Sequence, residues 1–267
     1  MIKLFASDID GTLLDKHRFI SNYTRDVLEG LSIPKILISA RMPKAMYYLQ
    51  ETLNILGSPI VCYNGALVLH NSEVLYELSI PFDELKKLVE IGEEFNLHVA
   101  CYRNDEWFVP VMDQWALREE NNTRVTPTVQ NISKTLDYFD ATSDKGGAHK
   151  VMFMGDENAM NLAFAKAEQL LNSKIHLYRS KNTYTEITPK GTSKEVALRK
   201  LLSLRFPEIN MENVVAFGDN YNDTEMLAVV GYGVAVENGR EVVKNAARFI
   251  TAHHKEDGVA KWLKDNI

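Results

Sequence analysis

The chain has 267 residues, of which 30 are Lys or Arg and 36 are Asp or Glu, giving a formal net charge of −6. Hydrophobic residues make up 45% of the sequence and charged residues 25%, which is typical of a globular protein and excludes a disordered or fibrous one. A net negative chain with no Lys/Arg-rich run lacks the charge that nucleic-acid binding requires. No apolar run approaches the roughly 20 residues of a transmembrane helix, so we expect neither a nucleic-acid nor a membrane partner.

The N-terminus and the cysteines predict a cytoplasmic protein. Residues 1–7 meet Asp8 and Asp10 too early to form the apolar core of a signal peptide. Cys62 and Cys101 are the two cysteines, and they lack the spacing of a metal site. We therefore expect two buried thiols in a reducing compartment.

The first eighty residues alternate short apolar runs with amphipathic segments. Strands are expected over residues 2–7, 35–38 and 60–63, with helices between them from Ser21 to Leu31 and from Pro43 to Leu56. Asn64-Gly65 indicates a turn, followed by hairpin strands over 66–69 and 74–80. Alternating strands and helices predict a mainly parallel sheet covered on both faces.

The pattern changes at Pro81. Helices are expected from Asp83 to Phe95 and from Asp156 to Leu171, and strands over 97–101, 149–154, 175–179 and 184–188. Residues 103–142 are poorly periodic, and 143–147 are predicted to form a loop. This segment is typical of an α+β unit with antiparallel strands.

The strand and helix alternation returns after Pro189. Thr192 or Ser193 is expected to begin a helix, with strands over 213–217, 233–236 and 248–250 and helices over 224–229 and 257–263. The sequence therefore predicts a Rossmann-like, doubly wound α/β core formed by residues 1–81 and 187–267, with an inserted α+β cap domain over 82–186.

Two acidic motifs follow buried strands. Asp8 and Asp10 come directly after the first strand, and Asp219, Asn222 and Asp223 come after the strand over 213–217. Either motif alone is compatible with an Asx turn or with acidic residues at a helix N-terminus. Together, at equivalent strand ends, they predict a site of hard oxygen ligands for a cation, preferably Mg²⁺.

Two further groups are candidates for anion binding. Lys194 lies in a predicted first helical turn, where a solvated lysine is the alternative, and Lys190 is a second basic candidate. Ser39, Ala40 and Arg41 follow another strand, where a hydroxyl and free N–H groups form an anion nest or simply begin a helix.

These motifs resemble those of a known family. Asp8-x-Asp10-Gly-Thr-Leu, Ser39, Lys194 and Gly218-Asp-x-x-Asn222-Asp223 occur in the order of the four motifs of haloacid dehalogenase-like phosphatases. Tyr63-Asn-Gly-Ala66 and Glu256-Asp-Gly-Val259 are similar to the Cof-type sugar-phosphate phosphatase subgroup, which carries a cap inserted between the second and third motifs.

The sequence departs from the subgroup at two positions. Ala40 stands where the subgroup usually has glycine, which constrains the backbone there. His254 stands where asparagine is common near the end of the chain.

The resemblance implies a Mg²⁺-dependent phosphomonoester hydrolase acting through an aspartyl-phosphate. Asp8 would attack phosphorus, and Asp10 would protonate the leaving oxygen and then activate water. The implied metal ligands are Asp8, the backbone carbonyl of Asp10 and Asp219, with Asp223 either a further ligand or a residue that orients the other ligands. The implied phosphate-binding groups are Ser39, the Ala40 N–H, Asn222 and Lys194.

A sum of charges supports an acidic role for Asp10. Four aspartates, one Mg²⁺ and Lys194 sum to −4 + 2 + 1 = −1, which would repel a phosphate dianion. A proton on Asp10 brings the sum to zero and is also what a general acid requires.

We expect the cap domain to determine which leaving group is accepted. The expected partner is a small phosphorylated metabolite. The protein is expected to be a monomer or a weak homodimer. A sugar phosphate is the first expectation. A nucleotide or cofactor phosphatase (flavin mononucleotide or pyridoxal phosphate), a phosphomutase and a non-catalytic phospho-ligand binding protein are the alternatives. The segments near Pro81 and Pro189 are the predicted hinges. Candidate substrate contacts, each also compatible with ordinary packing or solvation, are Arg41, Asn64, Arg103, Trp107, Trp115 and Tyr184.

Overall fold

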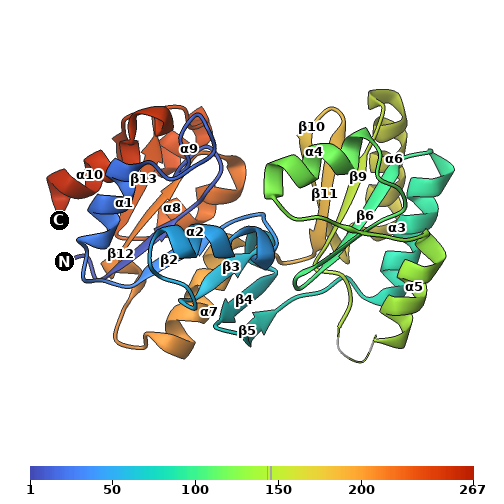
Figure 1. Cartoon of the computed structure of the whole chain (residues 1–267), viewed down its shortest axis with the longest axis horizontal. Helices are drawn as coiled ribbons and strands as arrows, with labels where there is room; N and C mark the ends of the chain where they lie inside the picture. Colours follow the sequence, from blue (N-terminus) through green and yellow to red (C-terminus); the bar gives the residue numbers. More distant parts are fainter. Residues whose placement is uncertain (143, 145) are drawn as a thin grey trace. The chain divides into compact units, whose positions relative to one another are not determined.

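The computed structural model of the chain describes residues 1–142, 144 and 146–267 (Figure 1), so the loop predicted over 143–147 lies partly outside the described residues. Two compact units are present. The core unit comprises Met1–Arg41, Met46–Glu77 and Ser193–Ile267, and the cap unit comprises Met42–Ala45 and Leu78–Thr192. The residues expected for the cap domain, 82–186, all fall in the cap unit.

The core unit is built on an eight-stranded sheet. Its strands are β1 (Leu4–Ser7), β2 (Lys35–Ile38), β3 (Ile60–Cys62), β4 (Leu67–His70), β5 (Glu73–Glu77), β12 (Val214–Gly218), β13 (Tyr232–Val236) and β14 (Phe249–Thr251). They lie in the order β14-β13-β12-β1-β2-β3-β4-β5. Neighbours from β14 to β3 are parallel, and β4 and β5 form an antiparallel hairpin at one edge. The α/β fold class predicted from the sequence is confirmed.

Helices cover both faces of this sheet. They are α1 (Asn22–Glu29), α2 (Tyr47–Thr52), α7 (Lys194–Arg205), α8 (Thr224–Val229), α9 (Glu241–Ala246) and α10 (Gly258–Asn266). On β1, Leu4 and Ala6 pack into a buried cluster with residues of α7, α8 and α9. Phe5 points to the other face, where its ring contacts Phe217, which in turn contacts Trp262 of α10. The period-2 alternation of β1 therefore separates the two helical layers.

The cap unit contains a six-stranded sheet. Its strands are β6 (His98–Arg103), β7 (Glu106–Val109), β8 (Thr128–Val129), β9 (Lys150–Met154), β10 (Ile175–Lys181) and β11 (Tyr184–Pro189), in the order β10-β11-β9-β6-β7-β8. All pairs are antiparallel except β7 and β8. Its helices are α3 (Phe82–Glu94), α4 (Gln114–Thr123), α5 (Ile132–Ala141) and α6 (Glu157–Leu171). Residues of α3, α5 and α6 share one apolar cluster with the sheet.

Residues 103–142, for which the poor periodicity predicted no elements, form regular structure. They contain β7, α4, β8 and α5. Asp113 and Asn131 begin the two helices, because their side chains accept backbone N–H groups of the first turn. Weak apolar periodicity concealed the helices, whereas these N-cap residues were a usable signal.

Two other elements differ from those expected. The helix predicted from Pro43 to Leu56 is a 3₁₀ turn at Pro43–Ala45 followed by the short α2. Asn54 adopts a positive φ, which ends the helical stretch before Leu56. Helix α9 was missed altogether. Both cysteines are buried, as expected, and neither forms a disulfide within the described residues.

Candidate active site

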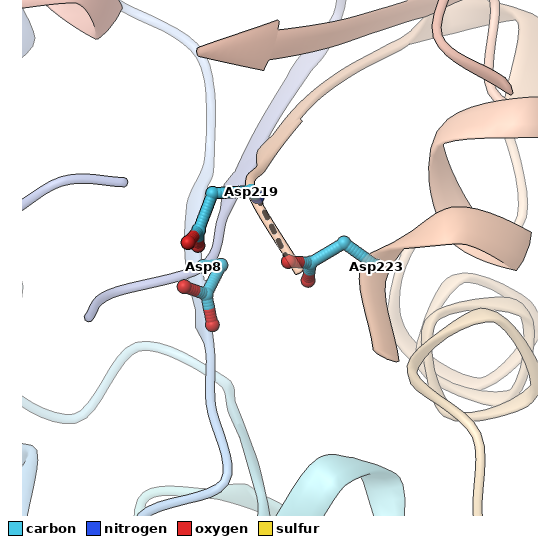
Figure 2. A group of neighbouring side chains, drawn as sticks. All are labelled: Asp8, Asp219 and Asp223. Atoms are coloured by element: carbon cyan, nitrogen blue, oxygen red, sulfur yellow. Dashed lines mark hydrogen bonds between the residues drawn. The ribbon is translucent and has the colours of Figure 1, made fainter. Parts of the chain in front are cut away.

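The two acidic motifs meet at one edge of the core sheet. Strands β1 and β12 are parallel neighbours with Ser7 opposite Phe217, so the residues that follow each strand emerge side by side. Carboxylate oxygens of Asp8, Asp219 and Asp223 all lie within 4.8 Å of one another (Figure 2). The parallel pairing thus assembles three acids from segments more than 200 residues apart in sequence.

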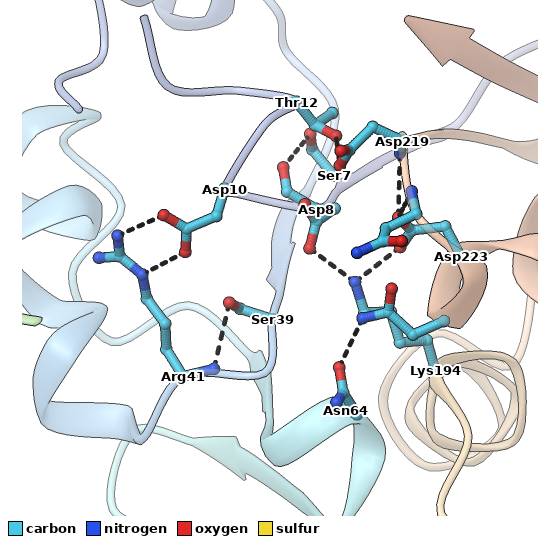
Figure 3. Close-up of polar contacts among 12 residues, drawn as sticks. Ser7, Asp8, Asp10, Thr12, Ser39, Arg41, Asn64, Lys194, Asp219 and Asp223 are labelled. Carbon is cyan, nitrogen blue, oxygen red and sulfur yellow. Dashed lines mark hydrogen bonds and ion pairs between the residues drawn. The ribbon is translucent and has the colours of Figure 1, made fainter. Parts of the chain in front are cut away.

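Lys194 lies between two of these acids. Its Nζ donates to Oδ1 of Asp8 and to Oδ1 of Asp223, both at 2.6 Å (Figure 3). The lysine is 1% exposed at the start of α7. Burial alone would lower the pKa of Lys194, but the carboxylates of Asp223 and Asp8 outweigh it and raise that pKa above its usual value. Lys194 therefore stays charged, whereas the rival Lys190 is exposed.

Local hydrogen bonds orient Asp223 and Asp219. Oδ2 of Asp223 accepts the backbone N–H groups of Asp219 and Asn220, each at 3.0 Å. The hydroxyl of Thr12 donates to Oδ1 of Asp219 at 2.9 Å. Thr12 belongs to the first motif but was given no role from the sequence, although it links the two motifs directly.

Crowding of these acids changes their protonation. Burial, followed by repulsion from Asp223, raises the pKa of Asp219 to about 6. Burial also raises the pKa of Asp8, although Lys194 opposes the change. A nearby cation would therefore stabilise the ionised form of both carboxyl groups.

The charge and chemistry of the cluster fit a divalent cation. Three carboxylates and the Lys194 ammonium sum to −3 + 1 = −2, which one Mg²⁺ would balance. All donors are hard oxygen atoms, the type that Mg²⁺ prefers. The cluster therefore fits the metal expected from the sequence.

The loop after Asp10 is held against Asp219. Gly11 has φ +86°, and a Cβ at this position would lie 2.6 Å from Oδ2 of Asp219. Asn238 donates to the Gly11 carbonyl at 2.7 Å and accepts from the backbone N–H of His254 at 3.0 Å. His254, one of the two departures from the subgroup, thus supports this loop from outside the cluster.

Polar residues from three segments of the chain line the part of the site next to the acidic cluster (Figure 3). The Asn64 backbone N–H donates to the Ser39 carbonyl at 2.9 Å, and Asn64 Oδ1 accepts from Asn222 Nδ2 at 2.8 Å. Oδ1 of Asn222 is buried without a hydrogen-bond partner in the described part of the chain. The backbone N–H of Arg41 donates to Ser39 Oγ at 3.2 Å, and Ala40 lies between them, partly exposed.

Asp10 lies apart from the acidic cluster. Arg41 donates to both of its oxygens, from Nε to Oδ2 at 2.6 Å and from Nη2 to Oδ1 at 2.8 Å, and Arg18 donates to Oδ1 at 2.8 Å. Burial acts to raise the pKa of Asp10, but these guanidinium groups outweigh it and lower that pKa. The protonated Asp10 expected from the sum of charges is therefore not favoured, because the sum omitted Arg18 and Arg41.

The four cap candidates lie in the cap unit and make contacts within it. Arg103 donates to Thr142 Oγ1 at 2.7 Å. Trp107 stacks on Tyr102, with ring centroids 5.6 Å apart. Trp115 meets Tyr184 edge to face at the same centroid separation. Their role toward a substrate stays a prediction.

Comparison with known proteins identifies the family. The sequence model of the haloacid dehalogenase-like hydrolases matches residues 5–263. The chain belongs to this family. The family and the enzyme class predicted from the motifs are thereby confirmed, and the acidic cluster, Lys194 and Ser39 all lie within the matched region.

Relatives resemble the chain over its whole length. A Bacillus subtilis protein named 5-amino-6-(5-phospho-D-ribitylamino)uracil phosphatase is 31% identical to this chain. The match covers 98% of this chain and 96% of that protein. The crystal structure of a haloacid dehalogenase-like hydrolase from Bacteroides thetaiotaomicron has a TM-score of 0.91 at 28% identity and covers 100% of both chains. A Thermotoga maritima structure has a TM-score of 0.89 at 27% identity, covering 100% of this chain and 98% of its own. In the described part of the chain, every helix is too short or too polar to cross a membrane.

Proposed function

We propose that the protein is a Mg²⁺-dependent phosphomonoester hydrolase that acts through an aspartyl-phosphate on Asp8. The observation that carries this proposal is the position of Asp8, whose carboxylate is bound by the buried Lys194 and lies beside Asp219 and Asp223. A carboxylate nucleophile divides phosphoryl transfer into two easier steps. It needs an adjacent positive charge to remain ionised, and Lys194 supplies one.

The remaining polar residues would bind the transferring phosphoryl group. Ser39 and Asn222 are joined through Asn64, which fixes their relative positions. The Ser39 hydroxyl, the Ala40 N–H and the second N–H of Asn222 Nδ2 are the proposed donors to the phosphoryl oxygens, whereas Oδ1 of Asn222 can only accept a hydrogen bond. Phosphoryl transfer depends mainly on positioning and charge, which such fixed groups provide.

Asp8, the backbone carbonyl of Asp10, Asp219 and Asp223 would hold the Mg²⁺ ion. The ion would neutralise charge on the phosphoryl oxygens and on the crowded carboxylates. Asp223 already accepts two backbone N–H groups and Lys194, so it would act mainly by orienting the other ligands.

Asp10 would serve as general acid and then as general base. It follows Asp8 by two residues, so its side chain leaves the backbone close to that of the nucleophile. Protonation of the leaving oxygen matters most for an alkyl ester, whose alkoxide is a poor leaving group. The residue would next accept a proton from the water that hydrolyses the aspartyl-phosphate.

The substrate we propose is a phosphate ester on a small polyhydroxylated carbon chain, first among them a sugar phosphate. The Bacillus subtilis relative favours a second candidate, a phosphorylated cofactor precursor, because its named substrate carries phosphate on a ribityl chain. Both candidates share an alkyl phosphomonoester flanked by hydroxyl groups. Arg103, Trp107, Trp115 and Tyr184 are the proposed contacts to the leaving group.

Phosphate release tests this function. We expect Mg²⁺-dependent release from sugar phosphates or from the phosphoribitylamino compound, and little release in EDTA. Asp8→Asn should abolish the activity with Mg²⁺ present, and retention of most activity would end the assignment. Binding without turnover would favour a phospho-ligand binding protein, and transfer of phosphate between sugar positions would favour a mutase.

A further inference from the structure

The carboxylate of Asp10 is fully engaged by two guanidinium groups. Arg41 contacts it in bidentate geometry, and Arg18 adds a third hydrogen bond to Oδ1. Figure 3 shows the Asp10 carboxylate pointing toward Arg41, whereas the Asp8 carboxylate points toward Lys194. Hydrogen bonds between ionised partners, bidentate ones above all, are the strong ones in proteins. The two catalytic carboxylates therefore face different partners.

Arg41 is a fixed partner of Asp10. Its side chain is 6% exposed, and Nη1 donates to the hydroxyl of Tyr48 at 3.0 Å. Its backbone carbonyl accepts the N–H of Tyr63 at 3.0 Å. The position of this guanidinium is therefore set by the core of the protein.

A short turn that begins at Asp15 positions Arg18. The Asp15 side chain accepts the backbone N–H groups of His17 and Phe19, and the Asp15 N–H donates to the Phe19 carbonyl at 2.8 Å. These bonds hold Arg18 at φ +62°, a region that residues with a side chain rarely adopt. The turn directs the half-exposed Arg18 side chain to Asp10.

A carboxyl group engaged in this way cannot serve as the acid. In the first step the Asp8 oxygen forms a bond to phosphorus, and the bond from phosphorus to the leaving oxygen breaks with its electron pair on that oxygen. The Asp10 proton must then reach this oxygen, which requires a free carboxyl oxygen within hydrogen-bond distance. All three hydrogen bonds described above compete with that arrangement.

We propose that Arg18 is a positioning residue that, together with Arg41, holds Asp10 in a withdrawn position which Asp10 leaves before it protonates the leaving group. This inference rests on the proposed function. Arg41 anchors the withdrawn position, and Arg18 adjusts how strongly it is favoured, because it is the more exposed partner. In the first step, the contact slows only those reactions that need the proton of Asp10.

A comparison of two esters with different leaving groups distinguishes a positioning role of Arg18 from a purely structural role. An alkyl ester such as D-ribose 5-phosphate needs a proton on its leaving oxygen, whereas p-nitrophenolate departs without one. The value of kcat/KM reports steps up to the departure of the leaving group, so the later use of Asp10 as a base does not enter it. The ratio of kcat/KM for the two esters therefore measures access to Asp10 as an acid.

The experiment compares three variants with the wild-type enzyme in excess Mg²⁺. Arg18→Asn removes the contact with a residue that tolerates positive φ, and Arg18→Lys restores a cation. Arg25→Gln is the control, because Arg25 is an exposed arginine paired with the adjacent Asp26. We expect Arg18→Asn to raise the alkyl-to-aryl ratio about two- to fivefold, as befits an exposed ion pair. Arg18→Lys should return the ratio toward the wild-type value, and Arg25→Gln should leave it unchanged.

An unchanged or lowered ratio in Arg18→Asn would overturn the inference. So would an equal loss for both esters, which would make Arg18 a substrate-binding residue. If the wild-type enzyme hydrolyses neither ester in Mg²⁺, the proposed function itself fails. If the wild-type enzyme is active, the alkyl-to-aryl ratio of the variants tests only the role of Arg18 and leaves the proposed function unaffected.

Discussion

The ammonium nitrogen of Lys194 lies 2.6 Å from Oδ1 of Asp8, and both side chains are almost completely buried. The same nitrogen also contacts Asp223 at 2.6 Å. One lysine therefore compensates two buried carboxylates. Removal of a single partner from such a group leaves an uncompensated buried charge, which costs far more than the loss of a surface ion pair.

Replacement of Lys194 should therefore affect stability and activity together. We expect Lys194→Met to lower the free energy of unfolding in EDTA by about 3–5 kcal/mol, because Asp8 and Asp223 lose their cation. We also expect kcat/KM to fall at least about 100-fold. Urea denaturation and phosphate release measure the two effects. Lys190→Met, at an exposed position, should behave like the wild type, and equal behaviour of the two variants would contradict the account.

Alanine substitutions at two glycines distinguish the effect of backbone strain from the effect of crowding at the metal site. Gly11 and Gly191 have φ values of +86° and +84°, but a Cβ on Gly191 meets no atom within 4 Å, whereas one on Gly11 meets Asp219. Alanine at Gly191 should cost about 1 kcal/mol of stability through strain alone. Alanine at Gly11 should cost more and also weaken Mg²⁺ binding, measured by titration calorimetry. Equal Mg²⁺ affinity in the two variants would refute the crowding argument.

Mg²⁺ binding should weaken in acid. The pKa of Asp219 is raised from 3.8 to about 6, so between these two pH values the folded protein binds a proton there that the unfolded chain releases. Proton uptake favours the folded state, and Mg²⁺ must displace this proton before it binds. We expect an affinity about tenfold lower near pH 5 than near pH 7, and a smaller increase in Tm on adding Mg²⁺. The Asp219→Asn variant should show a smaller pH dependence, because Asp8, whose pKa is also raised, still competes for a proton. A wild-type affinity independent of pH would contradict the prediction.

The acidic cluster could be predicted because parallel strands have a simple geometry. Asp8 and Asp219 each follow a buried apolar run, and parallel neighbours end at the same edge of a sheet. Lys194 was identified through the order of the motifs, since an isolated lysine in a first helical turn has no distinctive signal. Local pattern and family resemblance were both needed for this site.

The partners of Asp10 could not be predicted in the same way. The contact with Arg18 depends on a turn with one positive φ, which no hydrophobic period encodes. The polar helix α4 was missed for a related reason. Its apolar face is narrow, so Asp113 at its N-cap carries more information than its periodicity.

The most direct test of the central claim is to trap the phosphoryl group on the enzyme. The Asp10→Asn variant lacks the base for the second step, while p-nitrophenyl phosphate needs little acid in the first. After rapid quenching with Mg²⁺ present, peptide mass spectrometry should find the phosphoryl group on Asp8, and the additional change Asp8→Asn should abolish it. Turnover without a phosphorylated enzyme, or a phosphoryl group on another residue, would contradict the account.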